Sequence, residues 1–371
     1  MVLNWCKDVI TAKQKSEQPP PLYSFISGGA GTGKSHQMVL RTLRKEEEEP
    51  TSMKVLLMAS TGTAAHNIQG LTIHSALQLQ LGQHGKSYQR LGDEKRNTLR
   101  CKFSQLKLII IDEISMIGSN FFLQIHRGLQ EIFQSNNDFA AISILAFGDL
   151  YQLKPVCQKF VFQQPSDDYA RLCVHLWDNF KLVELTKIMR QRDEAEFARL
   201  LNRVRDGSQT NEDLVILETR ITEPTKEDDN MLHVYTTNAR VDSYNELKLS
   251  ELSAKLYTLT AVDIIPESMK HKNLPDDQRF TGGLKSVIQP KIGARIMLTK
   301  NLDVSDGLSS WVQGKISGFI LNDQITVAVL VQFSDIKIGK EAILQSKYNL
   351  SSFPPNSVPI QRLEVSFSLL E

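Results

Sequence analysis

The 371-residue sequence predicts an α/β protein built around a parallel sheet. Short apolar runs recur along the first half of the chain, and a polar turn and a helical pattern follow each run. Apolar runs of this length between helices are typical of buried parallel strands, because helices cover both faces of such a sheet. The predicted strands are Leu22–Ser27, Val55–Ala59, Leu108–Ile111, Ile142–Phe147 and Leu182–Leu185.

Changes of pattern along the chain predict four segments. Residues 1–20 are predicted as a short N-terminal helix and linker that ends in three prolines. Residues 21–180 form the first α/β domain, with a small basic insertion at about 81–105. Residues 181–284 are assigned to a partial second domain and residues 285–371 to a small β-rich module.

The later segments carry clear local patterns. A helix is predicted at Asp193–Arg205, with one apolar face and with Gly207 in the position of a C-terminal cap. That face consists of Phe197, Leu200, Leu201 and Val204. In the β-rich module, Ala294–Leu298 and Gln324–Phe333 are predicted as strands. The glycines at 307, 314 and 318 predict turns.

Composition excludes several classes of protein. The net charge of +1 provides no field over the whole chain for a nucleic acid, so any such contact needs a local basic surface. No apolar run is long enough to cross a bilayer and no signal pattern opens the chain, so we expect an intracellular protein without a membrane partner. The cysteines form no Cys-x-x-Cys pair and predict packed, reduced thiols without zinc. They are Cys6, Cys101, Cys157 and Cys173.

A glycine-rich turn after the first strand is the strongest motif. It fits Gly-x-x-x-x-Gly-Lys-Ser/Thr, whose backbone N–H groups cradle the phosphates of a nucleotide. Lys34 would reach the β- and γ-phosphates, and Ser35 would hold Mg²⁺. The predicted nucleotide-binding residues are Gly28, Gly29, Ala30, Gly31, Thr32, Gly33, Lys34 and Ser35.

Two further strands deliver polar residues to the edge where nucleotides bind in α/β sheets. Asp112 would join the magnesium shell and Glu113 would act as general base, although the two could also cap the following helix. Gln152 could sense the γ-phosphate, or it could belong to an ordinary strand end. Arg190 could stabilise transferred charge, although its spacing alone favours a surface arginine.

Together these segments resemble the superfamily-one helicases of the PIF and RecD type, most closely the PIF-like helicases, including those of Helitron transposable elements. Ser60–Ser75 looks like the second motif of that family, and Gly148–Val156 looks like the third. Arg190-Gln191 with the ending Arg205–Gly207 looks like the fourth. Gly293–Leu298 and Asn301–Asp303 look like the entry to a small β-barrel insertion.

The resemblance implies a phosphate-loop ATP hydrolase with two RecA-like domains, the second incomplete. It implies ATP and Mg²⁺ as cofactors and 5′-to-3′ movement on single-stranded DNA with unwinding of tailed duplexes. It also implies work in DNA repair, recombination and telomere maintenance, and a nuclear location in preference to a mitochondrial one. The sequence does not give the oligomeric state, and a monomer is the favoured expectation. Lys34, Glu113, Gln152 and Arg190 take the catalytic roles, while Ser35 and Asp112 bind the metal.

The resemblance makes Thr61, Asn67 and His74 the DNA-facing residues. For His74, a hydrogen-bonded histidine at a helix start is an equal alternative. A basic cluster lies where the family places a small wedge, and a solvated charged loop is again the alternative. The cluster consists of Arg90, Lys95, Arg96, Arg100, Lys102 and Lys107.

The chain departs from the family pattern at three places. Lys7 stands where a glutamine would read adenine, and Gly307–Trp311 replaces a Gly-Leu-Val-Asn-Gly turn. The last two family motifs do not occur before Glu371, so we expect ATP binding to survive better than hydrolysis, and hydrolysis better than unwinding. The alternatives are a non-unwinding ATP- and DNA-binding remnant and another phosphate-loop enzyme, such as a nucleoside kinase.

Overall fold

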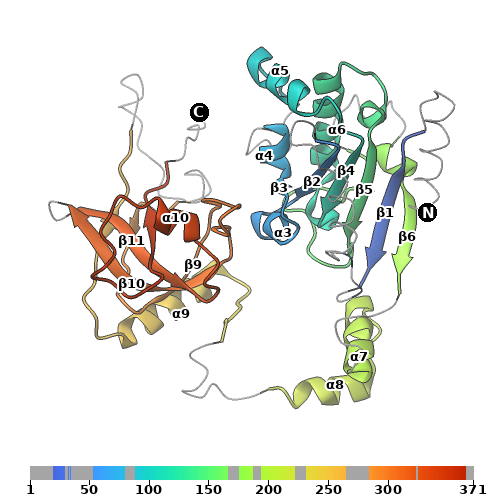
Figure 1. Ribbon diagram of the computed structural model, residues 1–371. Coiled ribbons are helices and arrows are strands. Elements are labelled where there is room, and N and C mark those ends of the chain that lie inside the picture. Colours follow the sequence, from blue (N-terminus) through green and yellow to red (C-terminus); the bar gives the residue numbers. More distant parts are fainter. Residues whose placement is uncertain are drawn as a thin grey trace, which may run out of the picture. The chain divides into compact units, whose positions relative to one another are not determined.

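The computed structural model describes most of the chain, which forms two compact units, residues 1–223 and residues 224–371 (Figure 1). The predicted helix in residues 1–20 lies outside the described residues, apart from Pro20. Among the described residues, no helix combines the length and the apolar character needed to span a bilayer. The described residues are 20–29, 32, 34, 53–79, 88–165, 175–186, 194–221, 231–264, 284–322 and 325–364.

A six-stranded parallel sheet organises the first unit. All five predicted strands are present, and β3 adds a short sixth strand. Every residue of β4 and β5 is buried, as expected for central strands with both faces covered. This is the mixed α/β architecture with the parallel sheet of a RecA-like core. In sheet order the strands are β3 (Leu71–Thr72), β2 (Val55–Ala59), β4 (Leu108–Asp112), β5 (Ser143–Gly148), β1 (Tyr23–Gly28) and β6 (Lys181–Leu185).

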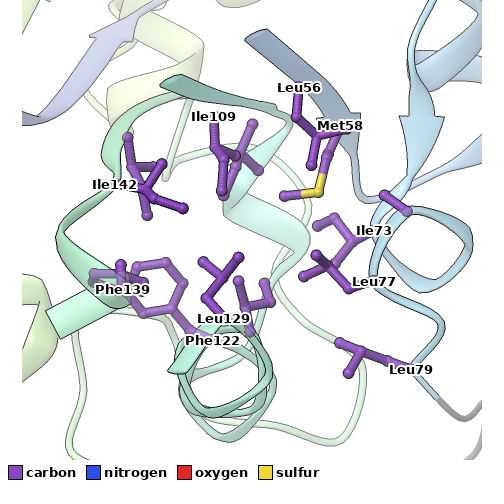
Figure 2. Packing of buried hydrophobic residues seen from close by; sticks show 14 of the residues in the cluster. Leu56, Met58, Ile73, Leu77, Leu79, Ile109, Phe122, Leu129, Phe139 and Ile142 are labelled. Atoms are coloured by element: carbon purple, nitrogen blue, oxygen red, sulfur yellow. The ribbon is translucent and has the colours of Figure 1, made fainter. Parts of the chain in front are cut away.

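The main core lies between this sheet and the helices that follow its strands (Figure 2). Leu56, Met58 and Ile109 project from the strands towards Phe122 and Leu129 of α6. All five side chains are at most 2% exposed, and burial of each contributes about 1.5–3 kcal/mol. The helices of this region are α3 (Gly62–Asn67), α4 (Ile73–Leu77), α5 (Asp93–Lys102) and α6 (Ser119–Phe133), with short 3-10 helices at Ile114–Met116, Asp138–Ala141 and Leu176–Asn179.

The first unit extends beyond the predicted boundary at residue 180. Strand β6 pairs in parallel with β1, with Phe25 opposite Leu182 and Ile26 opposite Val183. The apolar run that ends at Leu185 is therefore the edge strand of the first sheet. Within the described parts of residues 181–284 no second parallel sheet is formed, so a second RecA-like domain there stays a prediction.

Two helices complete the first unit. Helix α7 (Ala195–Asp206) confirms the predicted helix, and Gly207 ends it in a left-handed conformation with φ of 70°. Of the predicted apolar face, Leu200 is buried whereas Phe197 and Val204 remain exposed. Helix α8 (Asn211–Glu218) follows, tied back to α7 by a bidentate ion pair between Arg203 and Asp213 at 2.6 and 2.5 Å.

The second unit contains the predicted β-rich module. Its antiparallel sheet has the order β12-β11-β10-β9, and its two buried clusters lie against that sheet. Strands β9 and β11 confirm the two strands predicted from the sequence. The elements are α9 (Asn238–Glu251), β7 (Leu259–Thr260), β8 (Val287–Ile288), β9 (Arg295–Met297), β10 (Gln313–Asn322), β11 (Ile325–Phe333), α10 (Lys340–Leu344) and β12 (Val358–Gln361).

Two glycines predicted as turn residues lie inside β10, so that prediction was wrong. A Cβ atom on Gly314 would stand 2.5 Å from Val331, and one on Gly318 would stand 2.8 Å from the Phe353 ring. Gly318 also follows an irregularity in the pairing with β11. Here glycine permits close packing and a bulge within a strand. Gly307, with φ of 77°, does form a turn as predicted.

The cysteines that the structure describes differ from the prediction of packed thiols. Cys101 and Cys157 are free, as expected, but both are exposed. Cys101 lies on the solvent side of α5, whose buried residue is Leu99, and Cys157 lies in a surface turn.

Trp311 occupies the place of the last glycine in the family turn and adopts a left-handed backbone with φ of 74°. Its N–H donates to the carbonyl oxygen of Leu298 at 2.7 Å, which holds this conformation in place. The ring is 66% exposed, so little packing compensates for the backbone strain.

Replacing Trp311 by asparagine should stabilise the second unit. Asparagine tolerates the left-handed region, so the free energy of unfolding should rise by about 0.5–1 kcal/mol. Calorimetric unfolding of Trp311→Asn measures the change. The matched control is Leu344→Asn, which removes an exposed apolar side chain from ordinary helical backbone and should give no gain. Equal effects of the two substitutions would contradict strain at Trp311.

Candidate functional site

Three strands bring the predicted site residues to one edge of the sheet. β1, β4 and β5 run in parallel, with Ser27 opposite Gly148 and Ile111 opposite Ala146. Their carboxyl ends are therefore level, and the residues that follow each strand meet there. The turn after β1, the carboxylates at the end of β4 and the turn after β5 therefore lie together at this edge.

The turn after β1 is closely packed. A Cβ atom on Gly28 would lie 2.5 Å from Oγ1 of Thr32 and 2.9 Å from the carbonyl oxygen of Leu185, so only glycine fits. Thr32 donates its hydroxyl to the carbonyl oxygen of Gly29 at 2.9 Å. The ammonium of Lys34 donates to the carbonyl oxygens of Gly28 and Gly29, at 2.6 and 3.0 Å. Of the other predicted nucleotide-binding residues, Ala30, Gly31, Gly33 and Ser35 lie outside the described residues.

Carboxylates at the ends of β4 and β5 lie near the Lys34 ammonium. Burial lowers the pKa of the Lys34 ammonium, while the carboxylates of Asp149, Glu113 and Asp112 act in the opposite direction. Burial also raises the pKa of Glu113, and the neighbouring Asp112 raises it further against the attraction of Lys34. The result is one ammonium among three carboxylates, one of which holds its proton more strongly than an ordinary glutamate.

The backbone at Glu113 has an unusual conformation. Its φ of 53° and ψ of 49° place a non-glycine residue in the left-handed region, directly after the last residue of β4. The N–H of Glu113 donates to Oδ1 of Asp112 at 3.0 Å, which fixes the turn. Such conformations persist where surrounding contacts enforce them, and they cluster at functional sites.

The turn after β5 contains an ion pair that the sequence did not reveal. Asp149 is fully buried and accepts two hydrogen bonds from Arg205, at 2.7 and 2.9 Å. Burial alone would raise the pKa of Asp149, but the bonds from Arg205 and from the Tyr151 N–H, together with Lys34, bring it below its usual value. Gln152 donates its side-chain amide to the same carboxylate at 3.3 Å.

The sequence predicted Gln152 as the functional residue of the turn after β5, and it did not predict the pairing of Asp149 with Arg205. The two residues lie 56 positions apart, and only the three-dimensional structure brings them together. Each residue lay in a segment that resembles a family motif, Asp149 in the third and Arg205 at the end of the fourth, but nothing in the sequence paired the two. Arg190, the arginine predicted to be catalytic, lies outside the described residues.

The predicted DNA-facing residues follow β2 and β3 on the same edge. Ala59, at the end of β2, pairs with Asp112, and Thr61 starts α3 two residues later. The Thr61 hydroxyl accepts from the Ala64 N–H at 3.2 Å, so it also caps that helix. Asn67, the last residue of α3, is exposed.

His74 has a clear structural role. Its ring stacks on Phe121 with centroids 4.6 Å apart and planes within 18°, and the side chain is half-buried. This contact with α6 gives His74 a packing role, and its role toward DNA stays a prediction.

The basic cluster is divided between structural and exposed residues. Arg96 pairs with Asp93 at 2.5 Å and with Glu131 at 3.4 Å, and Arg100 donates to the carbonyl oxygen of Ile132 at 2.9 Å. These two arginines brace α5 against α6. Arg90, Lys95, Lys102 and Lys107 are exposed. Among the described residues no three histidine, cysteine or acidic side chains gather as a metal site of their own.

Comparisons with known proteins agree on one family. A family model of PIF1-like helicases matches residues 7–214. The ATP-dependent DNA helicase PIF1 of Candida albicans is 31% identical over 311 residues, which are 81% of this chain and 33% of that protein. The human ATP-dependent DNA helicase PIF1 is 32% identical over 305 residues, 80% of this chain and 44% of that protein.

A solved structure shows the same likeness. The crystal structure of a Pif1 helicase from Bacteroides in complex with ADP-AlF3 and single-stranded DNA matches with a TM-score of 0.58 and 26% identity. The match covers 88% of this chain and 72% of that one. The chain spans between a third and a half of the length of the curated relatives just named.

Replacing Asp149 by asparagine should destabilise the first unit in a pH-dependent way. The change removes the buried carboxylate partner of Arg205 and should cost about 2–3 kcal/mol, since the Arg205 side chain is still 22% exposed and keeps its pair with Asp206. Because the pKa of Asp149 is lower in the folded protein, the pair stabilises above the unfolded value of about 4 and is lost as the pH falls through the folded value. Urea unfolding of both proteins at several pH values measures this difference.

The matched control for Asp149→Asn is Asp206→Asn. Asp206 also pairs with Arg205, at 3.1 Å, but is exposed, so its removal should cost less than about 1 kcal/mol. A difference between wild type and Asp149→Asn that stays constant into the acid range would contradict the assignment.

Proposed function

The chain belongs to the PIF1-like helicase family, and we propose that it works as an ATP-dependent DNA helicase, coupling ATP hydrolysis to movement along single-stranded DNA and to unwinding of tailed duplexes. The observation that carries this proposal is the meeting of Lys34, Asp112 and Glu113 at one edge of a parallel sheet, beside the helix that Thr61 begins. The human and Candida albicans relatives are both ATP-dependent DNA helicases, which supports it.

The nucleotide would bind at the turn after β1. Phosphate oxygens would replace the carbonyl oxygens of Gly28 and Gly29 as acceptors for the Lys34 ammonium, because an anion is the stronger partner. Glu113 would accept a proton from the attacking water, and its raised pKa brings it closer to the range of an effective general base. Gln152 would contact the γ-phosphate or that water, and Arg190 would stabilise the charge that develops on the phosphate.

Mg²⁺ suits the donors at this edge. A protein usually holds Mg²⁺ through one or two carboxylates together with substrate phosphates, with no complete protein cage. The largely buried Asp112 carboxylate at the end of β4 supplies a hard oxygen donor, and Ser35 would supply the second ligand from the turn. When bound, the metal neutralises charge on the phosphates.

The DNA strand would cross the edge beside β2 and β3. Thr61 and Asn67 stand at the two ends of α3, and the first is only two residues beyond the strand that pairs with β4. Because Thr61 lies so close to the end of β2, and β2 pairs with β4, only a short stretch of protein would separate the nucleotide from the DNA strand. The Bacteroides Pif1 helicase was solved in complex with ADP-AlF3 and single-stranded DNA, which supports the binding of both kinds of ligand here.

Replacing Glu113 by glutamine should lower kcat for ATP hydrolysis by about 10²–10⁴-fold while nucleotide affinity is retained. In the wild type the rate should rise as the pH rises through the pKa of Glu113, above the usual value of about 4.3, because only the ionised carboxylate accepts a proton. Steady-state turnover with and without single-stranded DNA tests this. Glu218→Gln, on the exposed end of α8, serves as control. Undiminished turnover in Glu113→Gln would rule out this residue as the base.

Replacing Asn67 by alanine should weaken binding of single-stranded DNA and leave ATP binding unchanged. Loss of one hydrogen-bonding side chain should reduce affinity by about tenfold, corresponding to about 1.4 kcal/mol. Fluorescence anisotropy with a labelled oligonucleotide measures the effect. Asn136→Ala is the matched control. This exposed asparagine lies between α6 and β5, at the amino end of the strand and therefore away from the carboxyl ends where the DNA would bind. Equal DNA affinities for the two variants would remove Asn67 from the interface.

A further inference from the structure

Arg205 ties helix α7 to the turn after β5 on which Gln152 lies. We propose that Arg205 is a positioning residue that sets the side chain of Gln152 for the γ-phosphate, acting through the carboxylate of Asp149. The inference rests on the proposed function in one respect, namely that a nucleotide occupies the turn after β1. Arg205 ends the segment that resembles the fourth family motif, and the structure adds its connection to Gln152 through Asp149.

The geometry of the ion pair is strict. Nε and Nη2 of Arg205 donate to the two carboxylate oxygens of Asp149, at 2.9 and 2.7 Å. Such a fork fixes the plane and the direction of the carboxylate, which a lysine cannot do because its ammonium is a point charge. Since Asp149 is fully buried, its carboxylate has few other arrangements available.

Arg205 makes contact with more than one part of the turn. Its guanidinium lies over the Tyr151 ring, 4.4 Å from the ring centroid, while the remainder of that side chain is largely exposed. Oδ2 of Asp149 accepts from both Arg205 and the side-chain amide of Gln152. The position of Gln152 therefore depends on a carboxylate whose orientation Arg205 determines.

The other side of the turn is also fixed. A Cβ atom on Gly148 would lie 2.8 Å from Cγ2 of Ile114 and 3.1 Å from its backbone nitrogen, so the end of β5 abuts the residue that follows Glu113. Lys34 lies near enough to Asp149 for the carboxylate to raise its pKa. The turn is held between the predicted general base, the phosphate-binding lysine and Arg205.

Helix α7 gives Arg205 a mechanical role. Arg205 lies in the last turn of α7, and the helix begins shortly after Arg190, the predicted catalytic arginine. Ala198 and Leu200 are buried, so the helix is packed against the first unit along part of its length. A displacement at the start of α7 would reach Asp149 over about 15 Å of helix and alter the position of Gln152.

The same helix offers a matched control. Two residues before Arg205, Arg203 makes a shorter bidentate pair with the buried carboxylate of Asp213, but this pair joins α7 to α8. Arg203→Lys and Arg205→Lys each retain the charge and lose the fork. A merely structural role for Arg205 predicts that the two substitutions have similar consequences.

The experiment measures recognition of the γ-phosphate without turnover. Affinities for fluorescent ATPγS and fluorescent ADP, both with Mg²⁺, are compared for the wild type, Arg205→Lys, Gln152→Ala, the double variant and Arg203→Lys. We expect Arg205→Lys to reduce the preference for the triphosphate by about tenfold, with far less change for ADP alone. Arg203→Lys should leave the preference unchanged, even if thermal unfolding shows that it lowers stability as much.

The double variant decides whether Arg205 acts through Gln152. In the Gln152→Ala background, Arg205→Lys should change the preference by less than about twofold. If Arg205 acts through Gln152, the effects of the two substitutions are not additive. Additive losses, or an unchanged preference in Arg205→Lys, would overturn the inference, and so would a wild type that does not distinguish the two nucleotides.

ATP turnover with single-stranded DNA, measured in parallel, separates this inference from the proposed function. Absent turnover together with the expected loss of preference in Arg205→Lys would reject the helicase and leave the role of Arg205 standing. Normal turnover, together with a preference for the triphosphate that does not depend on Arg205, would reject the role of Arg205 and leave the proposed function standing.

Discussion

The parallel register of the first sheet is the constraint on which the site depends. Because β1, β4 and β5 run in the same direction, and because Ser27 is level with Gly148, each strand ends at one edge. A strand that slipped by one residue would turn its side chains to the other face and carry its terminal polar residue away from the site. The fully buried strands β4 and β5 make such a slip costly, so the same apolar residues that form the core also align the carboxylates.

Electrostatics then gives the aligned residues their chemistry. Burial raises the pKa of Glu113, and repulsion from the neighbouring carboxylates of Asp112 and Asp149 raises it further. The structure relieves this in two ways: Arg205 neutralises Asp149 through a fork, and Lys34 faces the remaining pair. Glu113 is left with the raised pKa. The arrangement therefore favours the ionised form of Asp149 and leaves Glu113 as the carboxylate that takes up a proton more readily.

The sequence predicts features that depend on local pattern and misses those that depend on distant contacts. The apolar runs specify all five main strands, and the glycine-rich turn is recognisable because its spacing is fixed by the shape of a phosphate group. Gly314 and Gly318 were read as turn residues because the side chains that crowd them, from Val331 and Phe353, are known only from the tertiary structure. The pairing of Asp149 with Arg205 was hidden for the same reason: the two residues belong to separate motif-like segments, 56 positions apart, and only the tertiary structure shows their contact.

Two residues in the left-handed region show how the same strain has different meanings. At Glu113 the conformation follows a buried strand, is fixed by a hydrogen bond to Asp112, and aims a carboxylate into a cluster of charges. At Trp311 it occurs in a surface turn of the second unit, held by one backbone hydrogen bond and with the ring largely in solvent. A strained backbone indicates function only where neighbouring groups interact with the side chain that the strained conformation directs toward them. By that criterion Glu113 belongs to the chemistry of the site, and Trp311 is a glycine position that the chain fills at some cost in stability.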